Sequence, residues 1–136
     1  MLNDTIFQAL AEQFNHERAN QVLYQAFADY LEGAAWPGFS HWFSKQAEEE
    51  GQHARRIAAY LIDHKRLPVY QPLDAPPVEG IDTTPEALFR LALERERLTT
   101  SMISQLYHLA DLEESPATCE FLLWFIREQV EEERAL

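Results

Sequence analysis

The sequence predicts an all-α protein, a single four-helix bundle over residues 1–136 in which one long connection joins the second and third helices. Four observations lead to this fold class. Glycine and proline divide the chain into four blocks, and apolar side chains recur within each block at steps of three and four. No block shows the alternation of a half-buried strand, and one of the breaks is long and rich in proline. Four amphipathic helices with these connections form a bundle.

The predicted helices differ in how clearly their ends are marked. Thr84 before Pro85 is typical of an N-cap followed by proline at the first helical position, and Ser115 before Pro116 has the same pattern. The fourth helix is expected to be short, at about 30 Å, with no fifth helix after it. The expected helices run over about residues 5–32, 39–65, 85–109 and 116–136.

The connection at residues 66–84 defines the topology of the bundle. Proline-rich chain extends by about 3.1 Å per residue, so this stretch can reach about 60 Å. A helix of the second block's length measures about 40 Å, so the third helix can start at the opposite end from where the second stops. We therefore expect helices two and three to be parallel. The short breaks at residues 33–38 and 111–115 predict antiparallel hairpins.

Composition excludes several functions. Acidic residues number 23 against 11 basic ones, and the formal net charge of −12 argues against nucleic acid or an anionic membrane as partner. No apolar run approaches the roughly 20 residues of a membrane span, and no secretory signal is recognisable at the start, so we expect a cytoplasmic protein. The single cysteine, Cys119, excludes an intrachain disulfide framework and a cysteine-rich zinc site.

Each predicted helix carries polar residues on its apolar face. Buried carboxylates are costly unless they are compensated, and four of them in one bundle repel one another, so a cation is the simplest compensation. The interrupting residues are Glu17 on the first helix, Glu50 and His53 on the second, Glu96 on the third, and Gln129 and Glu132 on the fourth.

The chemistry of these side chains favours iron or manganese. Glu50 and His53 are three residues apart, so both can reach one ion, and carboxylate oxygens with one imidazole suit these metals. Taken alone, Glu-x-x-His is usually a solvated pair that occurs by chance. Glu94 competes with Glu96 as the third-helix ligand, but only Glu96 lies on the apolar stripe.

The chain resembles the bacterial non-haem ferritins over nearly its whole length. The most specific segments are QAEEEGQHA at residues 46–54 and FLLWFIREQVEEE at residues 121–133, which is similar to the family's E-Q-x-E-E stretch after an aromatic pair. Asn15-His16-Glu17 and Glu96-Arg97-Leu98-Thr99 add to the likeness. The resemblance implies a ferritin-like bundle that stores iron and has a di-iron ferroxidase centre.

The resemblance also implies roles for individual residues. Glu17, Glu50 and His53 would hold the first iron, and Glu50 would bridge to a second iron held by Glu96 and Glu132. Gln129 would be a hydrogen-bonding group beside the centre. A third, weaker iron site matches Glu49, Glu128 and Glu131, with Glu132 shared, although an exposed acidic face is the alternative. Tyr24 could supply an electron, or could be a buried tyrosine with one hydrogen bond.

Related families are separated by what this sequence lacks. Rubrerythrins and bacterioferritins carry a second Glu-x-x-His on the fourth helix, whereas no histidine follows His108 here. The second helix has no methionine, so no haem is expected. Family members continue past this point with a longer fourth helix and a fifth one, which puts the complete cage in doubt more than the metal site.

Three functions follow as hypotheses. The first is Fe(II) oxidation with dioxygen followed by mineral storage. The second is a small rubrerythrin-like di-iron oxidase or peroxidase that stores nothing, and the third is a helical interaction module with an incidental metal site. We also expect a homodimer that builds toward a hollow twenty-four-subunit cage. Its outer apolar surface would include Phe27, Tyr30, Trp36, Trp42 and Tyr60, unless these aromatics fill the bundle ends.

Overall fold

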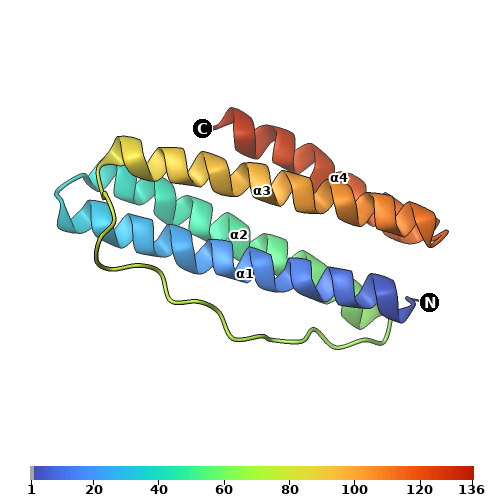
Figure 1. The fold of residues 1–136 in the computed structure, drawn as a ribbon. Helices are drawn as coiled ribbons and strands as arrows, with labels where there is room; N and C mark the ends of the chain where they lie inside the picture. Colours follow the sequence, from blue (N-terminus) through green and yellow to red (C-terminus); the bar gives the residue numbers. More distant parts are fainter. Residues whose placement is uncertain (1) are drawn as a thin grey trace.

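The computed structural model describes residues 2–136, and these residues form four helices and no strand, as predicted. The helices form two antiparallel hairpins, one of α1 and α2 and the other of α3 and α4 (Figure 1). The helices are α1 (Asp4–Gly33), α2 (Pro37–Asp63), α3 (Pro85–Leu112) and α4 (Pro116–Arg134). None of the helices in this part of the chain is both long and apolar enough to cross a membrane.

The connection over residues 64–84 runs along the whole bundle, from the end of α2 to the start of α3 (Figure 1). It therefore makes α2 and α3 parallel, which confirms the topology expected from its length. The side chain of Asn15 in α1 anchors this segment through two hydrogen bonds to its backbone, as the backbone of a neighbouring strand would. Its side-chain Nδ2 donates to the Val69 carbonyl at 2.8 Å, and its Oδ1 accepts from the Gln71 amide at 3.0 Å.

Two of the helix starts are capped by side chains. The Ile6 amide donates to Asn3 Oδ1 at 2.8 Å, and the Ala87 amide donates to Thr84 Oγ1 at 3.4 Å, as predicted for Thr84. Ser115 does precede α4, but its side chain accepts no bond from the helix backbone. Its hydroxyl instead donates to Thr118 Oγ1 at 2.8 Å.

The helix ends differ from the predicted ends by a few residues. Pro37 opens α2 instead of breaking the chain, because proline is well tolerated in the first helical turn. The turn before it is made by Ala35, whose φ of 64° is left-handed. At the other end, α2 stops at Asp63 because Lys65 has a φ of 63°. Similarly, α3 continues to Leu112 and stops before Glu114, whose φ is 53°.

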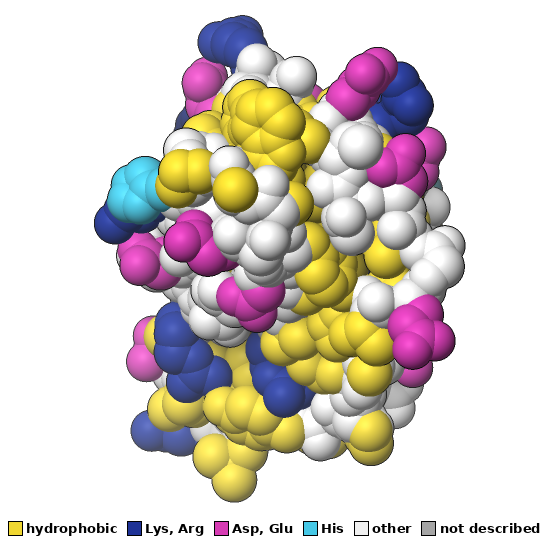
Figure 2. All heavy atoms as spheres, turned by 90° about the vertical axis from the view of Figure 1, so that its left-hand side faces the viewer, with side chains coloured by type: hydrophobic (Ala, Val, Ile, Leu, Met, Phe, Trp, Pro, Cys, Tyr) yellow, Lys and Arg dark blue, Asp and Glu magenta, His cyan; other side chains and the backbone are white. Residues whose placement is uncertain are grey.

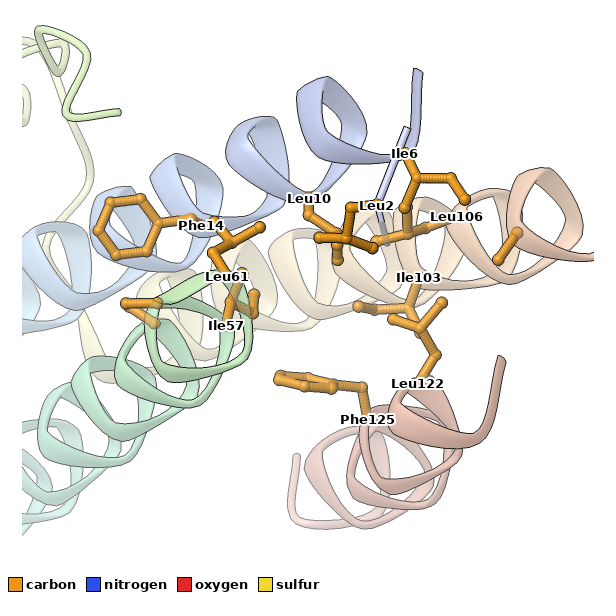
Figure 3. Packing of buried hydrophobic residues seen from close by; sticks show 13 residues of the cluster. Leu2, Ile6, Leu10, Phe14, Ile57, Leu61, Ile103, Leu106, Leu122 and Phe125 are labelled. Atoms are coloured by element: carbon orange, nitrogen blue, oxygen red, sulfur yellow. The ribbon is translucent and has the colours of Figure 1, made fainter. Parts of the chain in front are cut away.

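The buried apolar side chains form two clusters, one toward each end of the bundle. The cluster drawn in Figure 3 combines Leu10 and Phe14 of α1 with Ile57 and Leu61 of α2 and with side chains of α3 and α4. The second cluster lies toward the other end and packs aromatic rings from α1 and α2 against α3. Its buried members are Tyr24, Phe27, Ala28, Leu31, Phe43, Ala47, Leu88 and Ala92.

The five aromatics expected on an outer surface do not form one. Phe27 is 1% exposed and belongs to the second cluster, so its expected place on the surface is wrong. Tyr60 lies in the opposite half of the bundle, where it stacks on Phe121 of α4 with ring centroids 4.0 Å apart. Tyr30 and Trp42 are half-buried, and only Trp36 is exposed. These rings mainly fill the two ends of the bundle, because each end needs large side chains to close the space between its helices.

Candidate metal centre

A belt of buried polar side chains separates the two apolar clusters. Each helix contributes to it, because the polar residue interrupts an apolar stripe at about the same level along the bundle. The six side chains are Glu17 of α1, Glu50 and His53 of α2, Glu96 of α3, and Gln129 and Glu132 of α4, and none is more than 5% exposed. The structure thus brings together the six residues that the sequence selected for the centre. Glu94, the competitor of Glu96, is exposed.

Two groups of metal-ligand atoms lie in the belt and share Glu50. The carboxylates of Glu17 and Glu50 and the imidazole of His53 offer atoms that all lie within 4.8 Å of one another. The carboxylates of Glu50, Glu96 and Glu132 do the same. In the first group, His53 Nδ1 lies 3.2 Å from Glu50 Oε2 and 3.8 Å from Glu17 Oε2. Each group could hold a metal ion, and the two groups are adjacent because they share Glu50.

The hydrogen bonding of the belt is incomplete in the places a cation would occupy. Both carboxylate oxygens of Glu50, and Nδ1 of His53, are buried and find no hydrogen-bond partner among residues 2–136. Unpaired buried polar atoms are costly, and each of these is an atom that can coordinate a metal. The donor set of oxygens and one nitrogen suits iron or manganese. The residues present therefore fit a pair of metal ions.

The pKa values of the side chains in the belt also indicate that positive charge is missing there. Burial raises the pKa of Glu50 well above its usual range, and the carboxylates of Glu17 and Glu96 raise it further. Burial and the Glu96 carboxylate raise the pKa of Glu132 to about 9. Glu17 is the exception: burial alone would raise its pKa, but the neighbouring His53 imidazole and Glu50 carboxyl group lower it overall. In the metal-free chain, protons on Glu50 and Glu132 relieve a repulsion that cations would relieve in their place.

Tyr24 and Gln129 both bind Glu96. The Tyr24 hydroxyl donates to Glu96 Oε2 at 2.5 Å, while Gln129 Nε2 donates to Glu96 Oε1 at 3.0 Å and to Thr100 Oγ1 at 3.2 Å. Gln129 is thus placed as a hydrogen-bonding group, in line with the expectation. Burial and the charge of Glu96 raise the pKa of Tyr24 well above its usual range, so this residue stays a phenol.

The three residues expected to form a third iron site lie in different surroundings. Glu128 is half-buried, and its Oε1 lies 3.6 Å from His53 Nε2, where it forms a further ligand group with His53 and Glu132. Glu49 is half-buried beside Glu132, whose pKa it helps to raise. Glu131 is exposed and pairs with Arg134 at 3.2 Å. The third site therefore stays a prediction.

Polar residues around Glu17 were not found from the sequence. Gln13 Nε2 donates to Glu17 Oε1 at 3.3 Å, and Asn20 Nδ2 donates to Glu17 Oε2 at 3.4 Å. His16 is also buried, and burial together with the nearby Arg95 lowers its pKa to about 4. A signal was available, because Gln13, Glu17 and Asn20 are spaced by four and three residues on one helix face.

The fold and the site define a four-helix bundle with a buried belt of carboxylates that could hold metal ions, and comparison with known proteins shows its family. The profile of the Ferritin-like domain family matches residues 7–136. The bacterial non-heme ferritin of Bacteroides fragilis (strain 638R) is 34% identical over 133 residues, which make up 98% of this chain and 82% of that protein. The chain therefore belongs to the ferritin family.

Solved structures show the same relationship. A ferritin of Chlorobium tepidum superimposes with a TM-score of 0.95 at 29% identity, covering 99% of this chain and 82% of that one. A novel open pore ferritin from the archaeon Archaeoglobus fulgidus gives a TM-score of 0.94 at 31% identity, with the same coverage. This likeness confirms the predicted ferritin-like fold.

Proposed function

We propose that this chain is an iron-storage ferritin whose buried centre oxidises Fe(II) with dioxygen and passes Fe(III) on to a stored mineral. The observation that carries the proposal is the pair of ligand groups that share Glu50, whose oxygens and the neighbouring His53 Nδ1 find no other partner among residues 2–136. Family membership adds to it. We propose that the whole chain acts as one domain.

In this proposal, Fe(II) is the substrate and the chain's own residues hold it. Glu17, Glu50 and His53 bind the first ion, and Glu50 bridges to a second ion bound by Glu96 and Glu132. Each Fe(II) loses one electron, and dioxygen accepts both. Carboxylates favour the more highly charged product because they are hard anionic ligands.

Neighbouring residues complete the proposed centre. Gln129 and Tyr24 orient Glu96 through their hydrogen bonds. Tyr24 lies close enough to the second ion's ligand to supply an electron. A third and weaker iron site would use Glu49, Glu128 and Glu131 with Glu132, and binding there requires the pair of Glu131 with Arg134 to open.

Oxidation kinetics test the proposal. Anaerobic protein loaded with two Fe(II) per chain is mixed with dissolved dioxygen, and the rise of Fe(III) absorbance is followed. Glu50→Gln keeps the side-chain volume but removes the bridging carboxylate, so the fast phase is expected to fall by at least about a hundredfold. Glu48→Gln is the matched control, because Glu48 is exposed on the same helix and pairs with Lys45 at 3.6 Å.

The outcomes separate the three hypotheses. Equal fast phases in wild type and Glu50→Gln would sink the ferroxidase assignment. Oxygen consumption without retained iron after repeated loading would favour a non-storage oxidase. No oxygen uptake at all would favour an interaction module.

We further propose that the chain assembles as a homodimer and then as a hollow twenty-four-subunit cage. Solved relatives support this, since one of them is described as an open pore ferritin. Exposed apolar residues on the hairpin of α1 and α2, such as Val22 and Phe39, offer a surface for pairing.

A further inference from the structure

A closed ring of hydrogen bonds joins α1 to α3 directly behind Glu17. His16 Nε2 lies 2.7 Å from Thr99 Oγ1, and Asn20 Nδ2 donates to the same oxygen at 3.2 Å. Arg95 closes the ring from the other side, since its Nε donates to Asn20 Oδ1 and its Nη2 lies 3.3 Å from His16 Nδ1. The ring is largely dry, with His16 9% exposed and both Asn20 and Thr99 fully buried.

The chemistry of Arg95 sets the direction of every bond in this ring. A guanidinium can only donate, so the groups it faces, Asn20 Oδ1 and His16 Nδ1, must both accept. His16 therefore carries its proton on Nε2 and donates to Thr99. The Thr99 hydroxyl accepts from His16 and from Asn20, and it donates to the Arg95 carbonyl at 3.0 Å. With these proton positions every hydrogen bond in the ring has one donor and one acceptor, and no other placement of the protons satisfies all four side chains.

The ring therefore fixes which end of the Asn20 amide faces Glu17 and the proposed metal centre. With its carbonyl held by Arg95, the Asn20 amide must turn its NH₂ group inward, where it donates to Glu17 Oε2 at 3.4 Å. If the amide were free to turn over, its oxygen would face the Glu17 carboxylate and repel it. Glu17 thus receives a donor instead of an acceptor because of a side chain one layer farther out.

We propose that Arg95 is a positioning residue for the metal centre, acting through Asn20 to hold Glu17 in the orientation that binds the first ion. The proposal rests on the proposed function, because it takes Glu17 as a ligand. We expect Arg95 to strengthen cation binding, although its positive charge alone would weaken it. A positive charge near the site repels cations, so its removal should strengthen binding if charge were its only effect. If Arg95 acts by positioning, its removal should weaken binding.

Equilibrium binding of Co²⁺ under anaerobic conditions shows whether removal of Arg95 strengthens or weakens cation binding. The ion's visible absorption reports both occupancy and ligand number. Arg95→Met keeps the aliphatic stem, removes the donors, and is expected to weaken binding at the first site by about tenfold, with a changed band shape. Arg95→Lys retains a donor that can reach Asn20 Oδ1 and is expected to recover most of that loss.

Arg97→Met is the matched control. Arg97 follows Glu96 on the same helix, is exposed, and lies 3.9 Å from the Glu133 carboxylate. Its loss removes the same charge without touching the ring, so Co²⁺ binding should stay unchanged or become slightly tighter. In a second variant, Asn20→Ala, Arg95 is kept but the donor to Glu17 is lost, and the same tenfold weakening is expected. Adding Arg95→Met to Asn20→Ala should weaken binding no further.

Each result has one meaning. Wild-type protein that binds no Co²⁺ would contradict the proposed metal centre itself. Tight wild-type binding that Arg95→Met leaves equal or strengthens would overturn the positioning role. If Arg95→Met does not fold, Asn20→Ala decides, and unchanged Co²⁺ affinity in that variant would equally overturn it.

Discussion

Burial and neighbouring carboxylates raise the pKa of Glu50 and of Glu132 in the metal-free chain, that of Glu132 to about 9, and so favour the protonated forms of both side chains. Metals bind carboxylates in their ionised form. A cation entering the centre must therefore displace these protons, and its affinity should increase with pH. The same protons allow four buried carboxyl groups to coexist in one small belt before any ion arrives.

The raised pKa values also predict how the metal-free fold responds to pH. The pKa of Glu132 is about 9 in the folded chain and 4.5 as its reference value, so between these pH values the folded chain binds more protons than the unfolded chain. Stability from this group is complete below the lower value and is lost as the pH rises through the higher one. The free energy of unfolding should fall by at most about 1.4 kcal/mol per pH unit for each such carboxyl.

Urea unfolding at pH 7, 8 and 9 with a chelator present measures this effect. Glu132→Gln should flatten the slope, because glutamine does not titrate, whereas Glu131→Gln, at an exposed position, should leave the slope unchanged. His16 is neutral in the folded chain throughout this range because its pKa is about 4, and its contribution is the same in all three proteins, so it does not affect the difference between them. A slope that is the same in wild type and Glu132→Gln would contradict the prediction.

At the level of elements, the connection over residues 64–84 depends on a few contacts with α1. Asn15 supplies two of its hydrogen bonds, to Val69 and Gln71. Arg18 supplies another by donating to the Gln71 carbonyl at 3.2 Å, and it also lies over the Tyr70 ring at 4.6 Å. These contacts hold an extended chain that has no secondary structure of its own.

Asn15→Ala should therefore loosen the connection without unfolding the bundle. The Gln71 amide loses its acceptor, so its hydrogen exchange is expected to accelerate by about tenfold, while the global free energy of unfolding falls by only about 1 kcal/mol. Hydrogen exchange followed by mass spectrometry on peptides covering residues 66–75 measures this. Gln25→Ala serves as the control, because the side chain of Gln25, on the same helix, donates to Asp29 instead. Unchanged exchange at Gln71 would show that Asn15 does not anchor the segment.

Elements were predicted well from the sequence where one physical rule dominates. The helical period and the length of the proline-rich stretch were enough to give four helices and a parallel α2 and α3. The ends were less accurate, because Pro37 can open a helix as easily as break one, and left-handed Lys65 and Glu114 leave no clear mark in a sequence. Periodicity says which face a residue occupies but does not reveal the backbone angles of single turn residues.

The candidate site shows the same limit more sharply. Glu17 and Glu96 could be selected because a carboxylate on an apolar stripe is anomalous. The ring behind Glu17 was missed, because Arg95 is only half-buried and its importance depends on contacts between two helices that are distant in sequence. The surroundings of Glu131 were equally unpredictable, since its pairing with Arg134 depends on a side-chain rotamer.

At the scale of the whole molecule, the polar belt interrupts what would otherwise be one continuous core. Apolar side chains pack in the two clusters toward the ends of the bundle, and polar side chains occupy its middle. The two proposed ions, which together are bound by residues from all four helices, would join these helices at the point where apolar packing is weakest. Ligands that bind only the folded state stabilise it, by about 2.7 kcal/mol at a hundred times the Kd.

Exposed apolar side chains on the surface of the molecule lead to a prediction about assembly. Figure 2 shows hydrophobic side chains gathered on the end of the bundle where the turn between α1 and α2 lies, with acidic and basic groups around them. Trp36 and Phe39 are exposed in this part of the chain, at 47% and 40%. Farther along the same hairpin, Val22 of α1 is 40% exposed in a shallow groove that Ala47 of α2 also lines. Apolar side chains of this kind on one hairpin favour pairing between copies.

Val22→Asp should therefore weaken self-association by more than about tenfold, because an interface would bury an unpaired charge. Analytical ultracentrifugation at micromolar concentration is expected to show wild-type protein well above the 15.8 kDa of one chain, and the variant shifted toward it. Leu98→Asp is the control, because Leu98 is similarly exposed, at 47%, but lies on α3. A wild-type monomer would refute the dimer. A dimer without any larger species would refute the cage.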